Sequence, residues 1–240
     1  MAGFLLWSCS GDQKKLDVSE KDIDAYVEAK LQPDEIYEIQ ESGRFSREVE
    51  AFTEAYQCVS YKQNDTVVLI TESDNNKDRM INRNIYFMEG LPVFIEEMIF
   101  GNPEKPVENR KVYLNGVDVI AAYTKYADYE EEIEATEFTT FELSAFEFDF
   151  DRPLDAIAQR GDYEMKFGEF IVMPESQYLI LENKKSEYDV ALLIFESDEL
   201  ILQLFENPGK YRGKTVKFRH EFVLLYNVMQ MKYLGGEVMP

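Results

Sequence analysis

The chain has 240 residues, of which 45% are hydrophobic and 14% aromatic, and this composition excludes an intrinsically disordered protein. It carries 47 acidic and 25 basic residues, a formal net charge of -22, which excludes generic nucleic-acid binding because phosphate contacts need a basic surface. No apolar run reaches the length of about 18 residues that a transmembrane helix requires.

The first feature in chain order is an apolar stretch over residues 2–9, which is followed at once by a polar run over residues 10–15. Within it, Leu6-Trp7-Ser8-Cys9 resembles the end of a bacterial lipoprotein signal peptide, where a Leu, a variable residue and a small residue precede the lipidated cysteine. The resemblance implies a truncated signal-peptide-like segment over residues 1–9, a tether over residues 10–18 and lipidation at Cys9. It also implies that a lipid anchor makes the membrane a partner, and that the protein lies in the bacterial cell envelope, on the periplasmic face or the cell surface.

Two helices are predicted next. Ser19-Glu20-Lys21-Asp22 resembles a capping box, and apolar residues then recur at helical spacing until Pro33. A second helix is predicted from about Ser46, because Val49, Phe52 and Tyr56 repeat at intervals of three and four residues.

From residue 57 onward, short runs rich in Val, Ile, Tyr and Phe alternate with turn residues, which is typical of antiparallel sheet. Hairpins are predicted to turn at Glu89-Gly90 and at Asn115-Gly116. Further strands are predicted over residues 66–71, 165–173, 178–181, 190–195, 200–205 and 215–228. The predicted fold class is therefore α+β, with N-terminal helices followed by mostly antiparallel β-sheet. A second small β-barrel or sandwich-like half is left open for the C-terminal part.

The stretch from 128 to 151 contains ten acidic residues and no basic residue. Phe146, Phe148 and Phe150 alternate there with acids, which predicts a strand with one aromatic face. The composition shifts near Asp151-Arg152-Pro153. We therefore expect a helix-plus-antiparallel-sheet region over residues 19–151 and a β-rich region over residues 152–240.

No catalytic constellation is recognisable. His220 is the single histidine, and strand alternation places it on one face with Phe218 and Phe222, which predicts a packed side chain rather than a catalytic base. The carboxylates are too numerous to single out a pair, and Glu96-Glu97 is expected on the solvated surface. We predict no catalytic residue, no cofactor and no metal site, and we expect Cys58 to act as a small hydrophobic residue in a strand.

One basic cluster stands out in an otherwise acidic chain, with five bases within ten residues: Lys210, Arg212, Lys214, Lys217 and Arg219. One interpretation is that it neutralises the protein's own acidic stretch at 128–151. The other is that it binds an anion or an acidic partner.

These observations favour a non-enzymatic envelope lipoprotein whose β-rich body binds a ligand or a protein partner, such as another envelope protein, and does not bind nucleic acid. Two alternatives stay open at this point. One is a carboxylate-dependent hydrolase of the envelope, and the other is a soluble intracellular interaction protein.

Overall fold

The computed structural model describes residues 15–31, 37–101, 104–116, 118–142 and 148–239. Cys9 and the segment that resembles a lipoprotein signal lie outside these residues. Within the described part of the chain, no helix is long and apolar enough to span a membrane.

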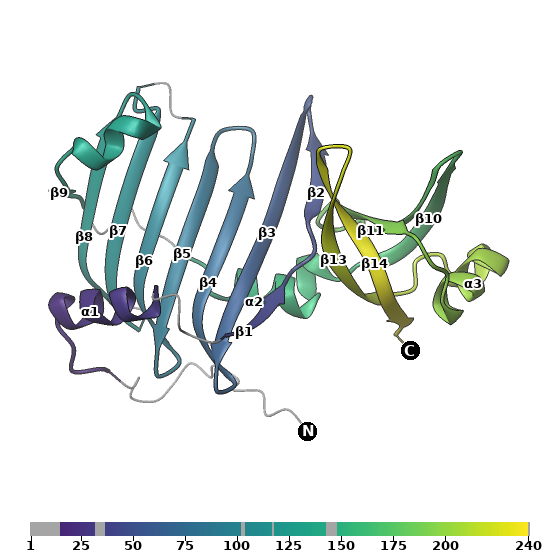
Figure 1. Cartoon of the computed structure of the whole chain (residues 1–240), viewed down its shortest axis with the longest axis horizontal. Helices are drawn as coiled ribbons and strands as arrows, with labels where there is room; N and C mark the ends of the chain where they lie inside the picture. Colours follow the sequence, from purple (N-terminus) through teal and green to yellow (C-terminus); the bar gives the residue numbers. More distant parts are fainter. Residues whose placement is uncertain (1–14, 32–36, 102–103, 117, 143–147, 240) are drawn as a thin grey trace.

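The predicted α+β fold with mostly antiparallel sheet is confirmed, because one large sheet runs through the described chain (Figure 1). Its first strands are β1 (Glu38–Glu41), β2 (Phe45–Val49), β3 (Phe52–Gln63), β4 (Thr66–Asn75), β5 (Met80–Met88), β6 (Leu91–Phe100), β7 (Val107–Asn115), β8 (Asp118–Ala127) and β9 (Thr139–Thr140). The later strands are β10 (Lys166–Met173), β11 (Ser176–Asn183), β12 (Tyr188–Ile194), β13 (Val216–Leu225) and β14 (Val228–Val238).

The strand order is β10-β11-β12-β2-β3-β4-β5-β6-β7-β8-β9, and β3 to β8 form an antiparallel meander. At the other end, β14 pairs with β13 and lies parallel to β12. A bridge between Lys166 and Thr215 brings β10 near β13, but the sheet as a whole does not close into a barrel.

Tight turns account for the meander. Both predicted hairpins are confirmed, with β5 pairing β6 through the turn at Glu89-Gly90 and β7 pairing β8. The second turn begins one residue later than the predicted Asn115-Gly116, because Asn115 is the last residue of β7 and pairs with Asp118. Glu89 and Gly90 have φ values of 51° and 80°, the positive φ at both positions that a type I′ turn requires. Such turns follow the right-handed twist of the strands and fix their register.

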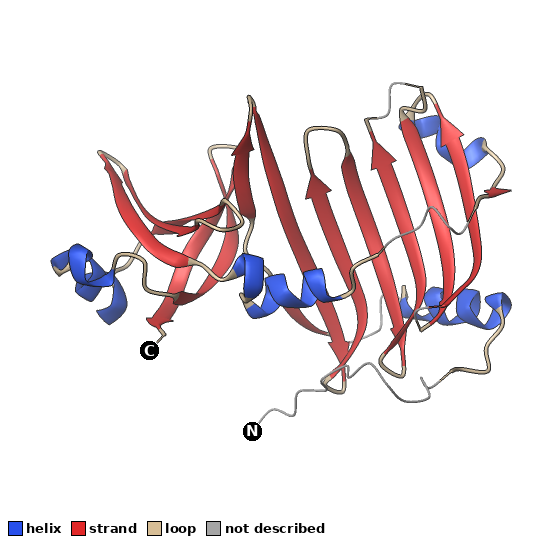
Figure 2. Cartoon of the chain, turned by 180° about the vertical axis from the view of Figure 1, so that it is seen from behind, coloured by secondary structure: helices blue, strands red, loops and turns tan. Residues whose placement is uncertain are grey.

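The helical segments are α1 (Glu20–Lys30), η1 (Glu130–Ala135), α2 (Asp151–Ala158), η3 (Gly161–Tyr163), α3 (Glu199–Glu206) and α4 (Pro208–Tyr211). The predicted capping box of α1 is confirmed, since Ser19 accepts from the Asp22 amide and Asp22 accepts from the Ser19 amide. Figures 1 and 2 show α1 and α2 on opposite faces of the sheet. We call these the α1 face and the α2 face.

Each face has its own core. On the α2 face, Ile70, Ile85, Ile95 and Val112 are fully buried in the larger cluster, which extends into the C-terminal strands. On the α1 face, Ile23 of α1 packs into a smaller cluster with aromatic side chains of the sheet. The meander strands therefore bury side chains on both faces.

The predicted helix from about Ser46 is wrong. The segment forms β2, a turn at Glu50 and Ala51, and the start of β3. Val49 pairs with Phe52 across this hairpin, so a chain reversal produced the three-residue spacing that mimics a helix.

The predicted strand over residues 200–205 is also wrong, because these residues lie in α3. Asp198 caps that helix by accepting from the Ile201 amide at 2.9 Å, and Leu200, Ile201 and Leu204 are buried. A short continuous apolar run does not distinguish a strand from a buried helix, whereas the capping residue does.

The predicted strand over Phe146 to Phe150 is not observed in its described part, since Phe148 and Phe150 lie outside any strand. Residues 143–147 lie outside the described residues. Phe148 and Phe150 instead pack against the larger core on the α2 face. Helix α2 begins at Asp151, where the composition shifts.

Candidate functional site

Side chains on the α1 face form rows that run across the meander strands. The rows change from apolar to mostly polar with distance from α1. One row consists of apolar and aromatic residues and lies near α1: Tyr61, Leu69, Tyr86, Phe94 and Tyr113. The next row is Val59, Thr71, Asn84, Glu96 and Lys111, and the third is Gln57, Ser73, Asn82, Met98 and Asn109. Polar residues therefore dominate the α1 face beyond the helix.

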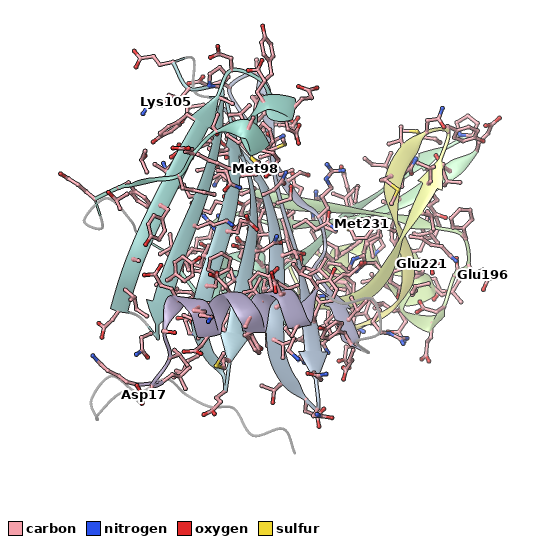
Figure 3. The ribbon with its side chains drawn as sticks, turned by 60° about the vertical axis from the view of Figure 1, so that its left-hand side comes forward. Asp17, Met98, Lys105, Glu196, Glu221 and Met231 are labelled. Carbon is pink, nitrogen blue, oxygen red and sulfur yellow. The ribbon has the colours of Figure 1, made fainter. Side chains whose placement is uncertain are left out.

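The residues of these two rows, apart from Lys111, form the floor of a groove with a volume of about 580 Å³. Its floor side chains come from β3 to β7, and Glu134 of η1 adds to its lining. Segment η1 lies against β7 and β8, with Ile133 buried beneath it. In Figure 3, Met98 marks the floor between α1 and the short helical segment η1. The groove is thus open between two helical segments that rest on the same face.

Asn109 is the least satisfied residue of the groove. Its side chain lines the groove, and the residue is only 4% exposed. Its amide oxygen Oδ1 is buried and has no hydrogen-bond partner among the described residues. A buried polar atom without a partner costs about 1–3 kcal/mol, and Asn109 carries such an atom in the lining of a groove.

The charged side chains around the groove are paired. Lys111 Nζ lies 4.0 Å from a carboxylate oxygen of Glu96, and Lys125 Nζ lies 3.5 Å from Glu134. Lys125 is buried and also lies over the ring of Phe138, 4.8 Å from its centroid. The other groove side chains are amides, hydroxyls, a thioether and an aliphatic group, so the site presents little unpaired charge.

Directly behind this floor, the α2 face carries a buried row of alternating charges. Arg83 Nη1 lies 2.8 Å from Glu72, and Arg83 Nε lies 2.6 Å from Glu97. Arg110 continues the row, 3.8 Å from Glu97 and 2.5 Å from Glu108. We call Glu72, Arg83, Glu97, Arg110 and Glu108 the charge ladder. The expectation that Glu97 lies on the solvated surface is wrong, because it is 3% exposed and paired with arginines.

The five residues of the predicted basic cluster differ in their contacts. Lys217 Nζ donates to the main-chain oxygens of Ala158 and Gln159 at the C-terminal end of α2, and burial lowers its pKa. Lys210 lies over the ring of Tyr211, and the Arg219 side chain lies close to Gly235. Arg212 and Lys214 are exposed. Glu134, in the acidic stretch, pairs instead with Lys125 of β8.

His220 and Cys58 lie where the strand pattern places them. The His220 ring is half-buried between Phe218 and Phe222, and burial lowers its pKa. Cys58 is buried on the α2 face, and burial raises the pKa of its thiol to about 12. A thiol with such a pKa is protonated and inert at neutral pH.

No family model, curated protein or solved structure matches the chain. The groove therefore has to be interpreted from its own geometry. The sequence does not predict the groove, because its floor residues belong to no motif. The available signal was a set of polar residues just before the predicted hairpins, because Asn82 and Asn84 of β5 and Asn109 of β7 occupy positions that a fully buried sheet would fill with apolar residues.

Proposed function

We propose that the protein is a non-catalytic binding protein of the bacterial cell envelope, anchored by a lipid on Cys9, that holds a hydrophilic ligand in the groove on the α1 face. The observation that carries this proposal is the unpartnered Asn109 Oδ1 in the lining of an open polar groove. A ligand donor that reached this atom would remove the cost of its burial, and that gain would appear as affinity.

Binding is favoured over hydrolysis by the state of the groove carboxylates. Hydrolysis by a carboxylate pair needs one acid to hold a proton and the other to be a free base or nucleophile. Glu96 and Glu134 each have a lysine within ion-pairing distance, so neither carboxylate is without a charged partner. The charge ladder on the other face is occupied by its arginines.

The envelope location rests on the sequence alone. Leu6-Trp7-Ser8-Cys9 resembles a lipoprotein signal, and the polar run over residues 10–15 resembles the tether that follows one. Within the predicted tether over residues 10–18, Leu16 and Val18 pack against the core on the α1 face, and the Leu16 amide donates to Asn115. An anchor at Cys9 joined to the body by a short polar tether would keep the groove near the membrane without inserting the sheet into it.

The test compares three forms of the full-length chain: the parent, Asn109→Leu and Ser60→Ala. Ser60 is the matched control, because its hydroxyl oxygen is also buried and has no hydrogen-bond partner in the described part of the chain, but lies on the α2 face. Each form is equilibrated with a hydrophilic extract of bacterial envelopes, washed and heat-denatured, and the released small molecules are identified by mass spectrometry. We expect the parent and Ser60→Ala to retain a compound that Asn109→Leu releases during washing. Identical retention by all three forms would contradict the proposal.

A further inference from the structure

The groove floor has a repeat that constrains its ligand. It takes side chains from five neighbouring strands, β3 to β7. Strands lie about 4.8 Å apart, so four intervals extend about 19 Å across the sheet. The spacing between strands is close to the spacing between rings in a linear hexose chain. The length of the floor across the sheet suits several sugar rings rather than one.

The donors and acceptors of the floor match hydroxyl groups. Amides and hydroxyls both donate and accept hydrogen bonds, as sugar hydroxyls do. The floor carries four such amides, Gln57, Asn82, Asn84 and Asn109, and two hydroxyls, Thr71 and Ser73. Asn109 Oδ1 is the one buried atom among them that still requires a donor.

A peptide fits this site less well. Peptides that bind sheets obtain their main-chain hydrogen bonds from a free strand edge. The strands beneath the groove are paired on both sides, with β4 between β3 and β5 and β6 between β5 and β7. Only side chains of the floor are therefore available to bind a ligand.

Charge points to a neutral ligand. The lysines nearest the groove are paired with Glu96 and Glu134, and the chain as a whole carries a formal charge of -22. An anionic ligand would find both lysines already paired and would be repelled at long range by the net charge. Met98 and Val59 supply apolar contacts on the floor, which suit the C–H faces of sugar rings.

We infer that the groove binds a neutral linear oligosaccharide laid across strands β3 to β7, with the Asn109 side chain rotating to present Oδ1 to one sugar hydroxyl. This inference rests on the proposed function and adds the ligand class to it. The sugar is held through floor amides and hydroxyls, and no bond of the saccharide is broken.

The test is isothermal titration of the full-length chain carrying Cys9→Ser. The probes are hexamers of β-1,4-linked glucose, α-1,4-linked glucose and β-1,4-linked N-acetylglucosamine. An α-1,4-linked hexamer of galacturonic acid is the charged control, and a Gly-Ser hexapeptide is the peptide control. We expect at least one neutral saccharide to bind and the charged hexamer and the peptide to fail.

Substitutions of groove residues test whether the saccharide binds in the groove. Asn109→Leu is expected to weaken saccharide affinity at least tenfold, whereas Ser60→Ala leaves it unchanged. Thr71→Val, which removes a floor hydroxyl at nearly constant volume, is expected to weaken affinity severalfold and serves if Asn109→Leu misfolds. Saccharide binding that neither groove variant weakens would overturn the inference.

Other outcomes separate this inference from the proposed function. Peptide binding that depends on Asn109, without saccharide binding, would overturn the saccharide class and leave the groove as a binding site. If none of the titrated probes binds, the saccharide class is also overturned. The proposed function is then still decided by the separate experiment with the envelope extract. Release of shorter saccharides during titration would overturn both, in favour of a hydrolase.

Discussion

The ammonium group of Lys217 donates to the main-chain oxygen of Ala158 at 2.5 Å, which ties β13 to the C-terminal end of α2. The last carbonyls of a helix have no intrahelical donors and lie at the negative end of the helix dipole. Lys217 therefore stabilises the contact between the C-terminal strands and the helix that covers the α2 face.

Replacement of Lys217 by Met should lower the free energy of unfolding by about 1 kcal/mol, the usual value of a hydrogen bond to a charged group at a helix end. Lys214→Met, at an exposed position, should change it by less than about 0.5 kcal/mol. Urea titration measures both changes. Equal effects of the two substitutions would indicate that Lys217 acts as ordinary surface charge.

Replacement of Arg83 by Met should be far more harmful. Its guanidinium neutralises both Glu72 and Glu97, whose side chains are 1% and 4% exposed. Removal of one partner from buried ion pairs typically costs about 3–5 kcal/mol, because the remaining charge stays buried. Arg160→Met is the control, since its pair with Asp155 is partly exposed and should contribute no more than about 1 kcal/mol.

Denaturant midpoints decide this prediction. If Arg83→Met does not fold, Arg110→Met offers an intermediate case, because the Arg110 side chain is 26% exposed against 13% for Arg83. If Arg83→Met and Arg110→Met each lower the free energy of unfolding by less than about 1 kcal/mol, buried water rather than arginine compensates the charges of the glutamates.

His220 should make stability depend on pH. Burial lowers its folded-state pKa below the ordinary value of 6.5, so the unfolded chain binds more protons in this range. Its contribution to stability is therefore present above about pH 6.5 and is lost as the pH falls towards the folded pKa. The slope cannot exceed about 1.4 kcal/mol per pH unit for one group.

This effect can be isolated, because His220 is the single histidine of the chain. Free energies of unfolding should fall between pH 7 and about pH 5.5, above the range where most carboxylates titrate. His220→Leu should flatten the curve in this interval. An unchanged slope in that variant would mean that an acidic residue causes the dependence.

Lipidation of Cys9 is tested by intact-mass analysis of protein extracted from bacterial membranes. We expect the mass of a chain that lacks residues 1–8 and has gained acyl groups. Cys9→Ser should leave the protein in the aqueous fraction with an unchanged melting temperature, because Cys9 precedes the described body. An unmodified chain from the membrane fraction would contradict the anchor.

The sequence predicted local structure well where a single turn or cap determines it. The turn at Glu89-Gly90 and the capping box at Ser19 are examples, because the residues that fix the geometry are adjacent. The hairpin at Glu50 and Ala51 lacks such a signal, and a false helix took its place.

The groove could not be predicted in the same way. Thr71, Asn84 and Glu96 form one row only because successive hairpins bring them into register, and each is more than ten positions from the next. Adjacency in sequence does not predict a shared site either, because neighbouring strand residues such as Glu96 and Glu97 point to opposite faces. One lines the groove and the other is buried in the charge ladder.

That alternation makes the meander intolerant of a register slip. If one hairpin between β4 and β7 slipped by a single residue, its ladder charges would move to the α1 face and its groove amides would enter the apolar layer against α2. Misregistered forms would bury unpaired polar groups on one side and expose charge on the other, so they would be short-lived during folding. Polar rows on both faces thus favour the native strand register over misregistered pairings, in addition to any role in binding.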